Sequence, residues 1–400
     1  MHRSTLRGLA APFIAITLLA GCALPPAGAP KADHAGLTPV PFATLPGWSV
    51  EAAVAGLPSF QRSCKVIAVM PVDQTLGGAG VAGALGGKAG QWRAACAAAE
   101  AVPPDDAAAA QHFFEAWMVP YAASGATRIT GYYEPVYPGS EIRERGYDVP
   151  IYGRPRNLVN ANLSAFRDAS GKRRIVGRLR YGTMVPYYTR AQIEAGEINR
   201  EAKVVAWVKN PVDAYMIQLQ GAARLRLPDG TLIDLGFDGT NGRTYTPIGK
   251  LMVEKGYLKP DQVSITSIRA WLLAHPVEAR GLMDANKNYV FFKRIRGVPD
   301  DLGTPGALDV PLAPEGSIAV DEKAIPLGAP VYVATKSLAR LTTAQDIDVG
   351  AHGTSAAQIF FGIGNEAAAQ ASAQDGTGRI FIFLPRQPAA APTSAKGASS

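Results

Sequence analysis

Two aspartates stand close together near the end of this chain, in the run Ala344-Gln345-Asp346-Ile347-Asp348-Val349-Gly350. An apolar run precedes them and a glycine follows, so we expect a strand that delivers both carboxyl groups into a tight turn. A carboxyl group at a strand end beside a tight turn can be both well held and partly exposed, which suits a functional site. The alternative is that both side chains only hydrogen-bond their own turn, as aspartate commonly does.

The elements that must position these two residues are mainly β. Short apolar runs separated by glycine and proline turns, with few helices, predict a barrel. Helical spacing predicts helices over 94–101, 105–119, 189–196 and 261–274, the last with Asp261 near its N-cap. Strands are expected over 130–135, 206–208, 215–219, 223–227, 232–236, 289–292, 318–320, 331–333, 359–361 and 380–383.

Composition limits the class of protein. The 400 residues are enough for about two domains, and 47% hydrophobic with 18% charged residues predicts a substantial core. The net charge of +7 is spread along the chain, and no basic motif with interleaved aromatic residues appears, so we expect no nucleic-acid partner. A basic surface still favours an anionic polymer or a membrane surface.

The N-terminus has the pattern of a lipoprotein signal. Arg3 and Arg7 precede an apolar run over 9–20 that is too short to span a bilayer, and the run ends Leu19-Ala20-Gly21-Cys22. This ending resembles a bacterial lipobox, which implies a signal peptide over 1–21 and lipidation of Cys22. Alanine rather than aspartate at position 23 indicates an outer-membrane lipoprotein that faces the periplasm, on a Pro-rich tether over 22–43. The alternative is an ordinary secretory signal with an incidental cysteine.

Two cysteines remain for the mature chain, Cys64 and Cys96. In an oxidising compartment they could form a disulfide, or each could be a small buried hydrophobic residue, and both alternatives stay open. The histidines are isolated and no group has the spacing of metal ligands, so we expect neither a metal nor a cofactor. The Pro/Ala/Ser-rich tail over 387–400 is expected to be disordered.

Several further runs, between about residues 110 and 386, occur in the same order as in the membrane-bound lytic murein transglycosylase A family, which this part of the chain resembles. The stretch from Asp346 to Gly364 is the last of the matching runs. The other runs are Thr130-Gly131-Tyr132-Tyr133-Glu134-Pro135, Trp207 through Asp213-Ala214-Tyr215-Met216-Ile217-Gln218-Leu219-Gln220-Gly221 to Leu227-Pro228-Asp229-Gly230, Asn241-Gly242-Arg243-Thr244-Tyr245-Thr246-Pro247-Ile248-Gly249-Lys250, Asn288-Tyr289-Val290-Phe291-Phe292, Ser317-Ile318-Ala319-Val320-Asp321 and Ile325-Pro326-Leu327-Gly328.

The resemblance implies a mainly β fold, in which a discontinuous double-psi β-barrel domain over 44–137 plus 286–386 is interrupted by a β-rich domain over 138–285. It also implies a monomer with a groove for a peptidoglycan glycan strand. The implied reaction cleaves the bond from N-acetylmuramic acid (MurNAc) to N-acetylglucosamine (GlcNAc) without water and leaves a 1,6-anhydro sugar.

That reaction needs only one carboxyl group, because the 6-hydroxyl of the sugar is the nucleophile. The resemblance places the family's acid directly before the Ile-Phe-Phe-Gly run, where this chain has Gln358, and an amide cannot give a proton and take it back. The family's second aspartate matches Asp346 or Asp348, depending on the register. We therefore carry two hypotheses: Asp346 or Asp348 has taken over proton transfer, or the protein binds peptidoglycan without cutting it.

Other matching residues are candidate glycan contacts. Tyrosine rings can stack on sugar faces, and the glutamines at 218 and 220 would share one face of the strand expected there. The alternatives are a half-buried barrel wall for the tyrosines and an exposed sheet face for the glutamines. The candidate contacts are Thr130, Tyr133, Gln218, Gln220, Asn241, Tyr245 and Tyr289.

Overall fold

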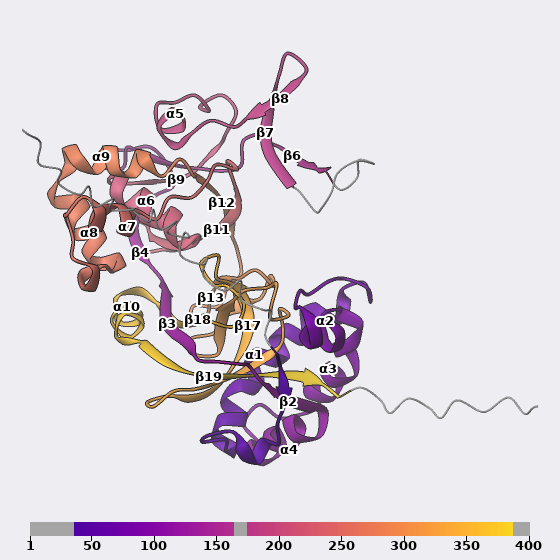
Figure 1. Cartoon of the computed structure of the whole chain (residues 1–400). Coiled ribbons are helices and arrows are strands. Elements are labelled where there is room, and N and C mark those ends of the chain that lie inside the picture. The colour runs from indigo at the N-terminus through magenta and orange to yellow at the C-terminus, as the bar shows by residue number, and fades with distance from the viewer. Residues whose placement is uncertain (1–35, 164–173, 387–400) are drawn as a thin grey trace, which may run out of the picture. The chain divides into compact units, whose positions relative to one another are not determined.

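The strands of the last part of the chain join one early strand to close a barrel (Figure 1). In the computed structural model, which describes residues 36–163 and 174–386, each strand pairs with the next and the last pairs with the first. Ile129, Ala357 and Ile359 are buried in its core, so these strands alternate as a barrel wall should. The ring runs β19 (Asp375–Pro385), β16 (Pro330–Ala334), β17 (Ala339–Ile347), β15 (Ser317–Val320), β18 (Ala356–Ile363), β3 (Thr127–Glu134) and back to β19.

The barrel is discontinuous, because a second group of strands lies between β3 and β15 in the sequence. This confirms the predicted fold class, a mainly β chain in which a discontinuous double-psi β-barrel is interrupted by a β-rich insertion. Its six-stranded sheet has the order β12 (Val290–Ile295), β11 (Leu232–Thr240), β10 (Ala223–Arg226), β4 (Val136–Ser140), β9 (Val204–Val208) and β5 (Val149–Tyr152). There are also two smaller sheets. One consists of β6 (Val159–Asn162), β7 (Arg174–Arg180) and β8 (Thr183–Pro186), and the other of β13 (Gly303–Pro305) and β14 (Pro311–Leu312).

The first part of the chain is helical and shares the core of the barrel. Phe60 of α1 (Val50–Val69), Trp92 and Phe114 of α4 (Ala107–Trp117) belong to the same buried cluster as the strand residues. The cysteines are joined: a disulfide links Cys64 on α1 to Cys96 on α3 (Arg93–Glu100). This part also contains β1 (Thr38–Pro39), the 3-10 helices η1 (Phe42–Thr44) and η2 (Ala89–Trp92), α2 (Gly80–Gly86) and β2 (Met118–Ala122). Later helices include α5 (Arg190–Glu194), α7 (Ile248–Glu254), α9 (Pro276–Ala285) and α10 (Gly364–Ala373).

The strand expected over 215–219 was wrong, because this segment lies in α6 (Pro211–Gln220). The Asn210 side chain caps the helix by accepting a hydrogen bond from the Asp213 amide, Pro211 sits in the first turn, and Gly221 ends it at a φ of 75°. These local signals outweigh the β propensity of the apolar residues. Positions 218 and 220 therefore do not share a face as they would on a strand.

The helix expected over 261–274 begins later than predicted. Ser264, rather than Asp261, caps α8 (Ile265–Ala274), and Asp261 lies in a preceding 3-10 turn. The predicted helices over 94–101, 105–119 and 189–196 correspond to α3, α4 and α5, the last capped by Thr189 as expected.

The predicted signal peptide, Cys22, most of the tether and the tail over 387–400 lie outside the described residues. Within the part of the chain that the structure describes, no helix has both the length and the apolar character needed to cross a membrane.

Candidate active site

The candidate residues meet in one row across four neighbouring barrel strands. Ala319 of β15 pairs with Asp346 of β17 on one side and with Gln358 of β18 on the other. Gln358 in turn pairs with Thr130 of β3. Because neighbouring strands are about 4.8 Å apart, segments distant in sequence are brought within side-chain reach of one another.

Asp348 is in direct contact with Gln358. The Gln358 Nε2 donates a hydrogen bond of 2.8 Å to Asp348 Oδ2. The other oxygen, Oδ1, accepts from the Gly350 amide at 2.8 Å, and the Asp348 amide donates to the Val320 carbonyl at 3.0 Å. Asp348 therefore does hydrogen-bond its own turn, but its second carboxylate oxygen also accepts a hydrogen bond from the side-chain amide of Gln358 on the neighbouring strand.

Asp346 is held in a more enclosed position. Its Oδ1 accepts hydrogen bonds from the amides of Ile347 at 3.0 Å and Ala307 at 3.1 Å, and its Oδ2 accepts from the Tyr132 hydroxyl at 3.1 Å. Burial raises the pKa of Asp346, although these three hydrogen bonds oppose the rise. The pKa of Tyr132 is also raised well above its usual value, first by burial and then by the Asp346 carboxylate.

Tyr132 was missed by the sequence reasoning, which chose Tyr133 instead. On β3, residues alternate between the two faces, so Tyr132 shares a face with Thr130 whereas Tyr133 does not. This alternation could have identified Tyr132 once Thr130 was a candidate.

A second buried acid, Glu134, ends the same face of β3. Its Oε2 accepts a hydrogen bond of 2.7 Å from the Thr304 amide, and its Oε1 lies 3.8 Å from Arg224 Nε. Arg224, on β10 of the inserted sheet, also pairs with Asp234 at 2.7 Å. Burial raises the pKa of Glu134 to about 7, in spite of the Thr304 amide and the Arg224 guanidinium. This ion-pair cluster ties a barrel strand to the inserted sheet.

The residue before Asp346 anchors β17 to α1. Gln345 is fully buried, and its Nε2 donates hydrogen bonds of 2.8 Å to the Ser59 carbonyl and to the Ser63 hydroxyl. Its Oε1 accepts from the Ser317 hydroxyl of β15. All the polar atoms of this side chain are therefore paired, and the strand end that bears the two aspartates is fixed against the helix next to Cys64.

The other predicted glycan contacts have different degrees of exposure. Tyr245 is 48% exposed, and Thr130, Tyr133 and Gln220 are partly exposed, which leaves them accessible. Three side chains are buried and hold the fold together, so none can touch a glycan without a rearrangement of its surroundings. They are Asn241, which donates to the Tyr188 and Lys287 carbonyls, Gln218, which accepts from the Val290 amide, and Tyr289, which packs with Phe291.

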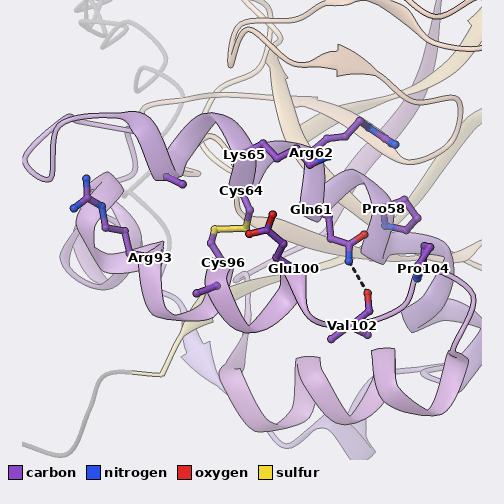
Figure 2. Close-up of a pocket in the computed structure, with 12 residues that line it drawn as sticks. Pro58, Gln61, Arg62, Cys64, Lys65, Arg93, Cys96, Glu100, Val102 and Pro104 are labelled. Atoms are coloured by element: carbon purple, nitrogen blue, oxygen red, sulfur yellow. Dashed lines mark hydrogen bonds between the residues drawn. A yellow bond between two sulfur atoms is a disulfide. The ribbon is translucent and has the colours of Figure 1, made fainter.

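A pocket of about 820 Å³ lies elsewhere, beside the disulfide on α1 and α3 (Figure 2). Arg62, Lys65, Arg93 and Glu100 line it, and the two aspartates do not.

Among the described residues, His, Cys, Asp and Glu side chains form no group of three or more that could hold a metal ion. The row across the barrel and its neighbours offer carboxyl, amide and phenol groups.

Fold and site together define a class: a two-part β protein in which a barrel bearing carboxyl groups is interrupted by a separate sheet. Family models match both parts, an MltA specific insert domain over residues 128–293 and a 3D domain over residues 316–384. The chain belongs to the membrane-bound lytic murein transglycosylase A (MltA) family.

Individual relatives agree with this assignment over most of the chain. Membrane-bound lytic murein transglycosylase A of Escherichia coli (strain K12) is 29% identical over 287 residues, which is 68% of this chain and 70% of the relative. The crystal structure of MltA from Neisseria gonorrhoeae in its monoclinic form is 30% identical, with a TM-score of 0.74 over 89% of this chain and 94% of that one. The membrane-bound lytic murein transglycosylase from Agrobacterium tumefaciens is 28% identical, with a TM-score of 0.77 over 88% and 98%.

Proposed function

We propose that this protein is a lytic transglycosylase that cleaves the β-1,4 bond from MurNAc to GlcNAc in peptidoglycan and forms 1,6-anhydro-MurNAc. Family membership supports the reaction class, and the relatives' names support murein as the substrate. The observation that carries the proposal is the 2.8 Å hydrogen bond between Gln358 and Asp348. It puts a carboxyl group beside the position where the family resemblance places the acid.

In the proposed reaction Asp348 does the work of both acid and base. Its carboxyl group gives a proton to the glycosidic oxygen as the bond from that oxygen to C1 breaks. The 6-hydroxyl oxygen of the same MurNAc then forms a bond to C1, and its proton returns to the Asp348 carboxylate. Gln358 orients the carboxyl group through its amide, and Asp346 supports this end of the barrel through Tyr132 and the Ala307 amide.

The second candidate function is binding of peptidoglycan without cleavage. Gln358 itself favours it, because an amide at the acid position cannot transfer a proton. Under this alternative, Asp348 only fixes the Gln358 side chain, and the accessible residues Thr130, Tyr133, Gln220 and Tyr245 hold the glycan.

The proposal extends to location and organisation. We place the protein at the periplasmic face of the outer membrane, as a monomer with a lipid chain on Cys22, because the N-terminal residues have the lipobox pattern and the relatives are named membrane-bound. We take residues 44–137 plus 286–386 as the barrel domain and 138–285 as the insertion, although β12, within the range 286–386, pairs with β11 in the inserted sheet.

The experiment is digestion of purified sacculi by the chain that begins at His34, followed by mass spectrometry of the soluble products. A transglycosylase releases muropeptides that carry 1,6-anhydro-MurNAc, whereas a hydrolase releases reducing sugars. Heat-inactivated protein is the control. Protein that sediments with sacculi and releases no anhydro product would replace the enzymatic proposal by the binding one.

A further inference from the structure

The small sheet of β6, β7 and β8 (Figure 1) has one face whose side chains are apolar and partly or largely exposed. Ala161 pairs with Ile175, and Leu179 pairs with Met184, so these four side chains point to the same side. Ile175 is 42% exposed and Leu179 is 62% exposed. Large apolar side chains gathered on an exposed face are unusual for a surface without a partner.

The turn that joins β7 to β8 adds a fully displayed aromatic ring. Tyr181 and Gly182 have φ angles of 49° and 77°, as in a type I′ hairpin turn. Asparagine, aspartate or glycine is the ordinary choice at the first of these positions, because a bulky side chain is strained there. Tyr181 is nevertheless 93% exposed, and the ring contact recorded for it among the described residues is with the Arg180 guanidinium at 5.5 Å.

The same hairpin is basic. Arg178 and Arg180 alternate with the apolar residues on β7 and therefore point to the opposite side, where the Arg178 guanidinium lies 4.2 Å from the centre of the Tyr188 ring. Residues 175–193 contain no aspartate or glutamate. Neither Arg178 nor Arg180 forms an ion pair among the described residues.

We propose that the tip of the β7–β8 hairpin docks on an anionic phospholipid surface. Leu179 and Tyr181 would enter the interface, where an aromatic ring with a polar tip is well suited. Arg180, whose guanidinium lies 5.5 Å from the centre of the Tyr181 ring, would bind lipid phosphates. This contact is independent of catalysis and is separate from the lipid chain proposed on Cys22. Two contacts would hold a protein at a membrane more stably than one.

The chemistry of the apolar face disfavours a glycan as its occupant. Small-molecule sites are concave and combine apolar walls with a few convergent polar groups, whereas among Ala161, Ile175, Leu179, Tyr181 and Met184 the only polar side-chain group is the Tyr181 hydroxyl. The positive charge of Arg180 at the tip of the hairpin likewise favours a negatively charged surface over a second copy of the same basic hairpin.

The test is vesicle binding by the chain that begins at His34, which lacks Cys22 and retains every described helix and strand. The vesicles are phosphatidylethanolamine mixed with phosphatidylglycerol, and phosphatidylcholine alone is the neutral comparison. The variant is Leu179→Ser with Tyr181→Asn, because asparagine suits the turn and should preserve the hairpin. Val277→Ser, at a valine 83% exposed on α9, is the matched control.

We expect the unmodified chain to bind the anionic vesicles and the double variant to bind them about tenfold more weakly or worse, with Val277→Ser unchanged. Added salt should weaken binding of the unmodified chain. The proposal is overturned if anionic and neutral vesicles bind equally, or if the double variant binds like the unmodified chain. It is also overturned if the double variant abolishes self-association, or sedimentation with sacculi, while leaving vesicle binding intact.

Discussion

At the scale of single residues, the two aspartates of β17 and its turn differ in what surrounds them. Asp346 receives two backbone amides and a phenol, and burial raises its pKa. Asp348 receives one backbone amide and the Gln358 side chain. The first arrangement fixes a buried carboxyl group, and the second leaves a carboxyl group next to Gln358, the position where we propose that the family's acid would stand.

The Tyr132→Phe variant should raise the pKa of Asp346 further, because the phenol hydrogen bond favours the ionised carboxylate. Losing a hydrogen bond to a charged group should lower the free energy of unfolding at pH 8 by about 1–3 kcal/mol. Urea unfolding measures the stability, and carboxyl carbon NMR measures the pKa. Tyr133→Phe, which removes the hydroxyl of the next residue, is the control, and equal effects of the two variants would contradict this role.

Glu134 should make stability depend on pH. Its pKa rises from an ordinary value of 4.5 to about 7, so the folded state holds this proton more tightly than the unfolded chain does. Its contribution is therefore largest below pH 4.5 and is lost as the pH rises towards 7. Glu134→Gln keeps an acceptor for the Thr304 amide and does not titrate.

Relative to the unmodified protein, the Glu134→Gln variant should gain on the order of 1–3 kcal/mol between pH 4.5 and pH 8. Urea unfolding at a series of pH values checks this, with the exposed Glu366→Gln as the comparison. Parallel stability curves for Glu134→Gln and the unmodified protein would show that the native state does not hold this proton.

At the scale of elements, the disulfide joins two helices next to the strand that carries the site. Cys64 adjoins Ser63, whose hydroxyl holds Gln345 of β17. Changing both cysteines to serine should lower the free energy of unfolding by about 2–4 kcal/mol, because the link closes a loop across 32 positions. Denaturant unfolding with and without reductant measures this. Reductant should destabilise the unmodified protein and leave the double variant unchanged; no effect on either would contradict a structural disulfide.

The elements also show which features the sequence could predict. Apolar runs located β15, β16 and β19, and Thr189 marked the start of α5. The segment after Asn210 was misassigned because its apolar residues fit a strand, while the cap, the proline and the closing glycine of α6 decide for a helix. The pairing of Thr130 with Asp375, which closes the barrel, is not encoded in any local pattern.

The candidate site, like the barrel, depends on how distant strands pair, so the sequence could propose its residues but not their contacts. The sequence identified Asp346, Asp348 and Gln358, but it could not show which aspartate meets the amide, because that depends on how β15 lies between β17 and β18. Burial of Asn241 and Tyr289 likewise results from tertiary packing around the inserted sheet.

At the scale of the whole molecule, the proposed lipid chain on Cys22 would hold the barrel and the inserted sheet at the membrane. If Cys22 carries lipid, Cys22→Ala expressed in a Gram-negative host should move the protein from the outer-membrane fraction to the soluble periplasm. Labelling with an alkyne fatty acid should mark the unmodified protein and not the variant. Cys64→Ser with Cys96→Ser keeps Cys22 and controls for general cysteine chemistry; labelling that survives Cys22→Ala would contradict the anchor.

The central claim is that the carboxyl group of Asp348 replaces the acid missing at Gln358. It is tested most directly by measuring the rate of 1,6-anhydro-muropeptide release from sacculi by three proteins: the unmodified chain, Asp348→Asn, and Asp348→Asn combined with Gln358→Asp. The account predicts that Asp348→Asn loses about a hundred- to ten-thousand-fold in rate. The exchanged pair should recover much of it, because a carboxyl group and an amide still face each other. An Asp348→Asn variant that releases anhydro products at the unmodified rate would contradict the claim.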